Sequence, residues 1–106
     1  MNCNQYQKDS SKTIVDLDYY KEKLNNEEEV LKKHLLNASA GISVESAEVL
    51  QSIQRYVYCG KDLNKDHIVE ECGDVLWYIS YLLTKLGVSL EECLRLNLTK
   101  VIKKYP

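Results

Sequence analysis

Two pairs of acidic residues, each pair three positions apart, have the types and spacing best suited to chemistry in this sequence. Glu45 and Glu48 form the first pair, and Glu71 and Asp74 form the second. Side chains three apart on a helix share a face, with about 5–6 Å between their Cβ atoms, so each pair can hold one cation. If the two helices face each other, the repulsion among four carboxylates calls for a cation to neutralise it. Oxygen ligands alone favour a hard ion, Mg²⁺ or Mn²⁺, over zinc or copper.

A solvated surface is the alternative interpretation of these four carboxylates. The first pair lies on a polar stripe of its expected helix, opposite an apolar stripe, as on any solvent-facing helix. The polar stripe also contains Ser52 and Arg55, and the apolar stripe consists of Leu50, Ile53 and Val57. Glu71 falls beside apolar positions, where it is partly withdrawn from water. Spacing alone therefore leaves a metal site and a solvated face both open.

Helices are expected to position these residues. The chain has four glycines and one proline, which is its last residue, and Leu, Lys and Glu are common, which favours helices over short strands. A first helical region is expected within Asn4–Leu24, interrupted near Ser10, and a second helix at Glu27–Ala38. The segment Ala40–Ser43 looks like a break between two helices, with Ser43 as the N-cap of the second.

Three further boundaries follow from glycine and serine positions. The helix that carries the first acidic pair should run to Tyr58 and stop at Gly60. Apolar residues at spacings of three and four predict a helix over Ile68–Leu86, closed by Gly87. A final helix opens at the capping box that starts with Ser89 and has glutamate three residues later. We expect an all-α fold, a small antiparallel bundle of four to five helices, in a single domain spanning residues 1–106.

The composition argues against several classes of function. Lys and Arg total 14 against 16 for Asp and Glu, and the net charge of -2 gives no long-range attraction to nucleic acid or to an anionic membrane. Apolar stretches are only a few residues long, and the N-terminus lacks the pattern of a signal peptide. The four cysteines form no C-x-x-C pair, so reduced thiols are expected. We expect a cytoplasmic protein that binds neither a nucleic acid polymer nor a membrane.

Three blocks of sequence carry a family resemblance. Gly41–Val49 contains E-x-x-E, and Glu70–Tyr78 contains E-x-x-D. The tail Asn97–Pro106 has the form N-x-x-K-V-x-x-K-Y-P. In this order the blocks resemble the MazG-type nucleoside triphosphate pyrophosphohydrolases, an all-α family whose closing motif is N-x-x-K-L-x-x-R-Y-P. The resemblance covers about residues 41–106.

The resemblance implies an enzyme that cleaves nucleoside triphosphates to the monophosphate and pyrophosphate with Mg²⁺, and with Mn²⁺ as a substitute. Typical substrates would be noncanonical or surplus deoxynucleotides, in a housecleaning role. The metal-ligand positions are Glu45, Glu48, Glu71 and Asp74. Bound ions would neutralise the triphosphate and lower the pKa of a water, and Glu48 is expected to orient that water or take its proton.

The resemblance also places Asn97, Lys100 and Lys104 where the family contacts phosphate or sugar. Arg55, two turns from Glu48, is expected to join them. Alternatively, the two lysines are cations near a helix C-terminus, which the helix macrodipole favours. Lysine at position 104, where the family has arginine, gives up a bidentate phosphate contact.

The aromatic residues suggest contacts beyond the chain's own core. Trp77 and Tyr81 lie off the main apolar stripe, so their helix needs cover on two sides. Together with the dimers and tetramers of the family, this predicts a homodimer or homotetramer. Base stacking in the substrate pocket is a second hypothesis for Trp77 or a tyrosine. His34 and His67 are interpreted as structural or solvent-facing.

Two other functions stay open at this level. A noncatalytic helical module of the same fold would bind a nucleotide or a protein partner without turnover. The related histidine-pathway enzymes hydrolyse phosphoribosyl-ATP, and a panel of nucleotides that includes this substrate separates the two activities.

Overall fold

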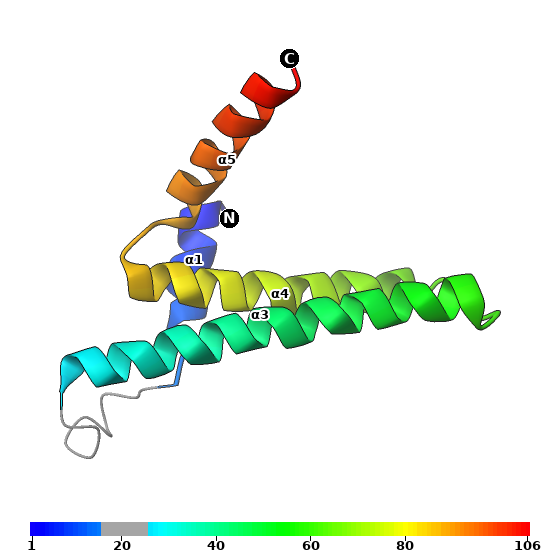
Figure 1. Ribbon diagram of the computed structural model, residues 1–106, viewed down its shortest axis with the longest axis horizontal. Helices are drawn as coiled ribbons and strands as arrows, with labels where there is room; N and C mark the ends of the chain where they lie inside the picture. The colour runs from blue at the N-terminus through cyan, green and yellow to red at the C-terminus, as the bar shows by residue number, and fades with distance from the viewer. Residues whose placement is uncertain (16–25) are drawn as a thin grey trace.

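The computed structural model describes residues 1–15 and 26–106, and all regular structure in these residues is helical. The helices are α1 (Cys3–Ser11), α3 (Glu27–Tyr58), α4 (Lys65–Leu86) and α5 (Leu90–Lys104), as Figure 1 shows. The predicted all-α class is confirmed. The first predicted helical region ends at Ser11, near the interruption expected there, and its remainder at 16–24 lies outside the described residues.

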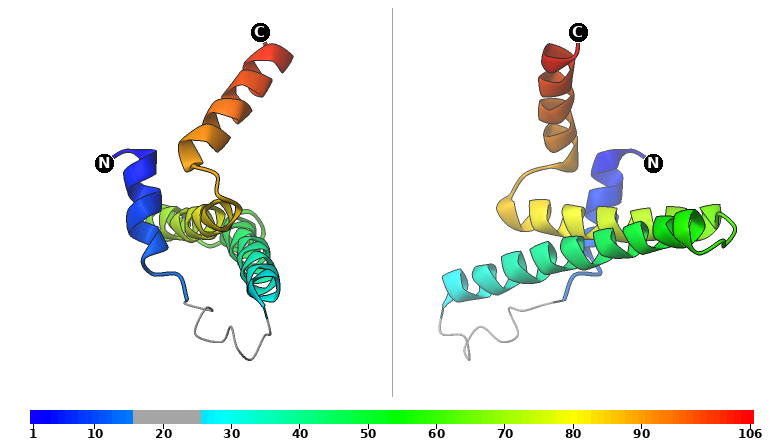
Figure 2. Two further views of the ribbon diagram at one scale, coloured as in Figure 1. Left: turned by 90° about the vertical axis from the view of Figure 1, so that its left-hand side faces the viewer. Right: turned by 45° about the vertical axis from the view of Figure 1, so that its right-hand side comes forward.

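The long helices α3 and α4 lie side by side and antiparallel (Figures 1 and 2). Helix α3 begins where the Asn26 side chain accepts a hydrogen bond of 2.7 Å from the Glu29 N–H. Three consecutive glutamates lie in its first turn, where their negative charges interact favourably with the positive end of the helix dipole. The helix ends at Tyr58, two residues before Gly60, which adopts a φ of 65°. The predicted stop is therefore confirmed.

The predicted break at Ala40–Ser43 is wrong, because α3 runs through it without interruption. Gly41 is helical, and a Cβ atom at this position would lie 2.2 Å from two ring carbons of Tyr78 on α4. The glycine thus permits close contact between the two helices, a tertiary role that local sequence does not show. Ser43 does not cap a helix, because its hydroxyl donates back to the Ser39 carbonyl at 3.2 Å.

The ends of α4 and α5 follow the sequence closely. Gly87 has a φ of 72°, and the N–H of Val88 donates to the Leu83 carbonyl at 3.0 Å, which forms a Schellman turn with the Gly87 N–H on Thr84. The Ser89 hydroxyl then accepts the Glu92 N–H at 3.1 Å and opens α5. Both predicted signals are confirmed. The Glu92 side chain itself pairs with Arg95.

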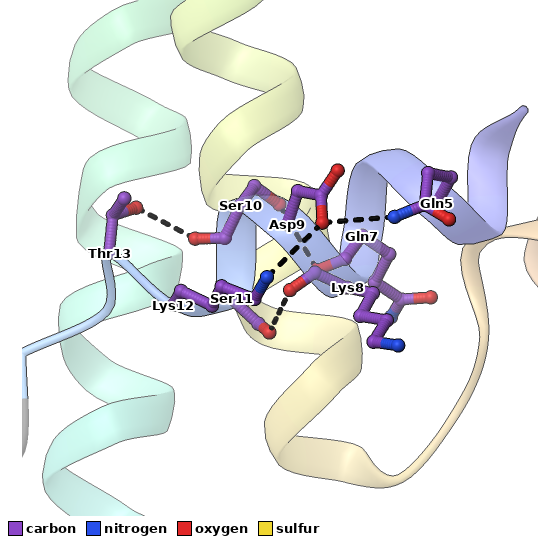
Figure 3. A network of polar contacts seen from close by, with 8 residues as sticks. All are labelled: Gln5, Gln7, Lys8, Asp9, Ser10, Ser11, Lys12 and Thr13. Atoms are coloured by element: carbon purple, nitrogen blue, oxygen red, sulfur yellow. Dashed lines mark hydrogen bonds and ion pairs between the residues drawn. The ribbon is translucent and has the colours of Figure 1, made fainter. Parts of the chain in front are cut away.

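Helix α1 crosses α4 and contacts α5 (Figure 2). Gln7 makes most of this connection: its amide nitrogen donates to Thr84 Oγ1 at 3.3 Å and to the Val88 carbonyl at 3.0 Å, and its oxygen accepts the Leu90 N–H at 2.7 Å. The C-terminal end of α1 is closed by local side-chain bonds, among them Thr13 Oγ1 to the Ser10 carbonyl at 2.7 Å (Figure 3). Helix α1 therefore has a fixed position against α4 of the antiparallel α3/α4 hairpin.

Little apolar surface is buried within one chain. Among the described residues the buried apolar side chains are Val30, Ala38, Tyr81 and Leu90. The apolar stripe of α3, with Leu50 and Val57 more than half exposed, faces solvent, whereas the polar stripe faces α4. The radius of gyration is 16.8 Å, against about 13 Å for a compact chain of this length. No helix within the described residues is long and apolar enough to cross a membrane.

Candidate functional site

Three carboxylates converge between the two long helices. Glu45 comes from α3, Glu71 and Asp74 come from α4, and one oxygen of each lies within 4.8 Å of the others. The contact between Gly41 and Tyr78 lies one turn away along each helix, so it holds the helices together beside the carboxylates. We call these three side chains the carboxylate cluster.

Burial of two members makes the cluster unlike a solvated acidic face: Glu45 is partly buried and Glu71 is buried, whereas Asp74 is exposed. Glu71 is 8% exposed. The Oε2 atoms of Glu45 and Glu71 are shielded from water and have no hydrogen-bond partner among the described residues. A shielded anionic oxygen without a donor is costly, because it loses its hydration and gains nothing in return. The arrangement favours a bound cation or a bound proton.

Glu48, the fourth predicted carboxylate, is exposed and lies beside the cluster. Burial raises the pKa of Glu45 from 4.5 to about 7, and the Glu48 carboxyl adds to this effect. Contact with Glu48 is the main cause that raises the pKa of Glu71, and burial adds to it. Two ionised carboxylates are both acceptors, so such a contact becomes a hydrogen bond only when one of them holds a proton.

His67 also belongs to the site. Its Nε2 lies 3.4 Å from Glu71 Oε1, and this neighbour lowers the pKa of Glu71 against the other influences. The interpretation of His67 as structural or solvent-facing therefore missed a neighbour of the cluster. The i, i+4 spacing of His67 and Glu71 was the signal that could have found it. His34 is buried instead, and its Nδ1 lies 2.6 Å from the Tyr81 hydroxyl.

A pocket of about 400 Å³ opens beside the cluster, and we call it the aromatic pocket. Its lining includes Asn37, Ala40 and Glu45 of α3 and Trp77, Tyr78 and Tyr81 of α4. The indole N–H of Trp77 donates to Thr13 Oγ1 at 2.8 Å, so the segment after α1 holds one wall in place. The sequence analysis did not assign Thr13 or Asn37 to the site, because each reaches it only through packing against α4.

Arg55 lies on the other side of the cluster, in a pocket of about 200 Å³ that we call the basic pocket. Its lining residues are Ser52, Arg55, Lys61, Asp62, Asn64 and His67. The predicted polar stripe of α3 thus connects the cluster to a cationic site, and Lys61 is an addition that the sequence analysis did not include.

The predicted contacts on α5 are not brought to the cluster within one chain. Asn97, Lys100 and Lys104 are exposed, and α5 leaves the hairpin at the end of α4, as Figure 1 shows. The Lys104 ammonium lies 5.3 Å from the centre of the Tyr105 ring, which is an exposed local contact.

The fold and the cluster define an all-helical protein whose acidic site lies between two antiparallel helices. Residues 33–106, well over half of the chain, match the family model of the MazG nucleotide pyrophosphohydrolase domain, and the chain belongs to this family. The match begins within α3 and includes α4 and α5, so α1 lies outside it. No curated protein and no solved structure matches the chain.

Proposed function

We propose that this protein is a nucleoside triphosphate pyrophosphohydrolase that depends on a divalent ion, Mg²⁺ or Mn²⁺, and releases pyrophosphate and a nucleoside monophosphate. The observation that carries the proposal is the pair of shielded carboxylate oxygens, on Glu45 and Glu71, that lack a donor among the described residues. Family membership adds the reaction class. A role in removing noncanonical or surplus deoxynucleotides fits this chemistry.

The donor set fits a hard cation. Glu45, Glu71 and Asp74 offer oxygens within 4.8 Å of one another, and Glu48 stands next to two of them. An all-oxygen set with water in the remaining positions is what Mg²⁺ prefers. When bound, the ion would neutralise the triphosphate, polarise phosphorus and lower the pKa of a water. These four carboxylates would hold it.

Glu48 is suited to be the general base. It is exposed, so it reaches solvent, and it is near enough to Glu45 and Glu71 to raise the pKa of both carboxyls. In the reaction, water oxygen bonds to the α-phosphorus, the bond to the bridging α–β oxygen breaks, and pyrophosphate leaves with that electron pair. The water proton goes to Glu48.

A homodimer or homotetramer would complete the site. The apolar stripe of α3 faces solvent in one chain, and α4 also exposes Val69 and Leu76. Covering these faces with a second copy buries the missing apolar area. Assembly also gives Asn97, Lys100 and Lys104 a route to a substrate, because the α5 helix of one chain extends away from its own hairpin.

Pyrophosphate release tests the proposal. A panel of ribo- and deoxynucleoside triphosphates and phosphoribosyl-ATP is assayed with Mg²⁺ and with EDTA. We expect Mg²⁺-dependent release by the wild type and at least a hundredfold loss in Glu48→Ala, as for removal of a general base. Glu70→Gln is the matched control, because Glu70 is exposed and is not among the cluster residues.

Two outcomes would overturn the proposal. One is a wild type that releases no pyrophosphate above the Glu48→Ala background with any nucleotide. The other is nucleotide binding in calorimetry without product and without a change in Glu71→Ala, which would establish the noncatalytic module instead.

A further inference from the structure

Two pockets of opposite character adjoin the carboxylate cluster, one on each side along the α3/α4 hairpin. Glu45 belongs both to the cluster and to the lining of the aromatic pocket. His67 lines the basic pocket and lies 3.4 Å from Glu71 of the cluster. The three features therefore form one continuous line, with the carboxylates in the middle.

The order of residues on both helices fixes this line. On α3, Asn37 precedes Glu45 by eight residues, and Arg55 follows Glu48 by seven. At a rise of 1.5 Å per residue, the two pockets extend about 10–12 Å to either side of the carboxylates. Because α4 is antiparallel, it repeats the order, with Tyr81 at the aromatic end and His67 at the basic end.

The aromatic pocket suits a nucleobase and does not suit phosphate. None of its lining residues in the described part of the chain is a cation, and it contains Trp77, Tyr78 and Tyr81. The Trp77 and Tyr78 rings are 4.9 Å apart at their centres. Thr13 fixes Trp77, and His34 lies 2.6 Å from the hydroxyl of Tyr81, so the walls are in place before a ligand binds.

The basic pocket suits the phosphate end. Arg55 and Lys61 line it, and Asp62 offsets only one of these charges. Pyrophosphate gains negative charge as its bond to the α-phosphate breaks, so cations at this place stabilise the leaving group more than the ground state. An aromatic pocket at the same place would provide no such stabilisation.

On the basis of the function proposed above, we propose that the nucleotide lies along the hairpin in one direction. Its base occupies the aromatic pocket beside Asn37, its α-phosphate meets the carboxylate cluster, and its β- and γ-phosphates lie in the basic pocket against Arg55 and Lys61. Lys61 is thereby assigned as a residue that holds the departing pyrophosphate.

Product inhibition tests the phosphate end. Inorganic pyrophosphate and the nucleoside monophosphate product are each used as inhibitors of hydrolysis of the best substrate. Lys61→Ala should raise the inhibition constant of pyrophosphate about fivefold to tenfold, the effect of one charge-assisted contact, and leave that of the monophosphate unchanged. Lys65→Ala is the matched control, because it removes the same charge four residues further along, outside the pocket.

A bulky side chain tests the base end. Ala40 is exposed, helical and part of the aromatic pocket, so Ala40→Trp fills space without disturbing a core. It should raise the inhibition constant of the monophosphate about tenfold or more and leave that of pyrophosphate unchanged. Ala47→Trp, at an exposed position of α3 outside the aromatic and the basic pocket, controls for the added ring.

The two inhibition constants in each variant decide whether the nucleotide binds in the proposed direction. If Lys61→Ala weakens the monophosphate and not pyrophosphate, or if Ala40→Trp does not weaken the monophosphate, the proposed direction is wrong. These results are read from an active wild type, so they refute the direction alone. A wild type without pyrophosphate release refutes the proposed function itself.

Discussion

Replacing Glu45 by glutamine should stabilise the metal-free protein at neutral and alkaline pH. The substitution keeps the size of the side chain and removes one negative charge from the carboxylate cluster. In the wild type that charge is held against burial and against the carboxylates of Glu48, Asp74 and Glu71. The variant should therefore unfold at a higher temperature in EDTA, although it has lost one of the carboxylates proposed to bind a cation.

The size of the effect follows from the pKa of Glu45, which is raised from 4.5 to about 7. For a fully buried group this change would correspond to about 3 kcal/mol. Glu45 is only half-buried, so solvent screening reduces the expected value to about 1–2 kcal/mol. The folded state holds the Glu45 proton more tightly than the unfolded state. The free energy of unfolding of the wild type therefore falls as the pH rises from 4.5 to about 7, and the contribution of Glu45 is constant at higher pH. The variant should lack this fall.

Thermal unfolding in EDTA at pH 5 and pH 8, at one protein concentration, measures the prediction. At pH 8 a gain of 1 kcal/mol corresponds to roughly 4–8 °C in Tm, and the difference should shrink toward pH 5. Mg²⁺ at about 100 times its Kd should add about 2.7 kcal/mol to the wild type and much less to Glu45→Gln. Glu70→Gln should match the wild type throughout. A variant no more stable than the wild type in EDTA at pH 8, or one that Mg²⁺ stabilises equally, would refute this reasoning.

Three further predictions concern the contacts that hold the site in place. Gly41→Ala should destabilise the protein by about 1–3 kcal/mol in urea unfolding, because its Cβ would clash with the Tyr78 ring. Helix propensity alone would stabilise the variant by about 1 kcal/mol, so the sign of the change in unfolding free energy separates the two effects. Thr13→Val removes the acceptor of the Trp77 indole N–H and should raise KM several-fold with little loss of stability; an unchanged KM would separate the aromatic pocket from catalysis. Gln7→Ala should increase amide hydrogen exchange at Leu90, whose N–H it leaves without its present acceptor, and unchanged protection there would show that α1 is held by other contacts.

The helix ends were predictable because their causes are local. Ser89 and Gly87 act on backbone groups within a few residues, so their sequence context suffices. Gly41 misled the prediction for the opposite reason. Its small size permits a contact with Tyr78, which lies 37 positions away in sequence. Local helix propensity depends only on nearby residues, so it does not predict this contact.

The candidate site was predictable in its parts and not in its arrangement. The three-residue spacings placed each carboxylate pair on one helix face, and the family motifs singled out the same four residues. Which face of α3 turns toward α4 could not be derived, because the apolar stripe would ordinarily face inward and here it faces solvent. Thr13 and Lys61 join the site only through the path of the chain between helices.

The position of Trp77 allows ligand binding to be followed by the intrinsic fluorescence of the protein. It is the chain's single tryptophan, and its ring forms a wall of the aromatic pocket beside Glu45. All indole fluorescence therefore originates at one known point, a few ångströms from where a base would stack and from the acidic side chains. Emission can be followed during titration with a nucleotide or a metal ion without any label, and the signal contains no background from a second indole elsewhere.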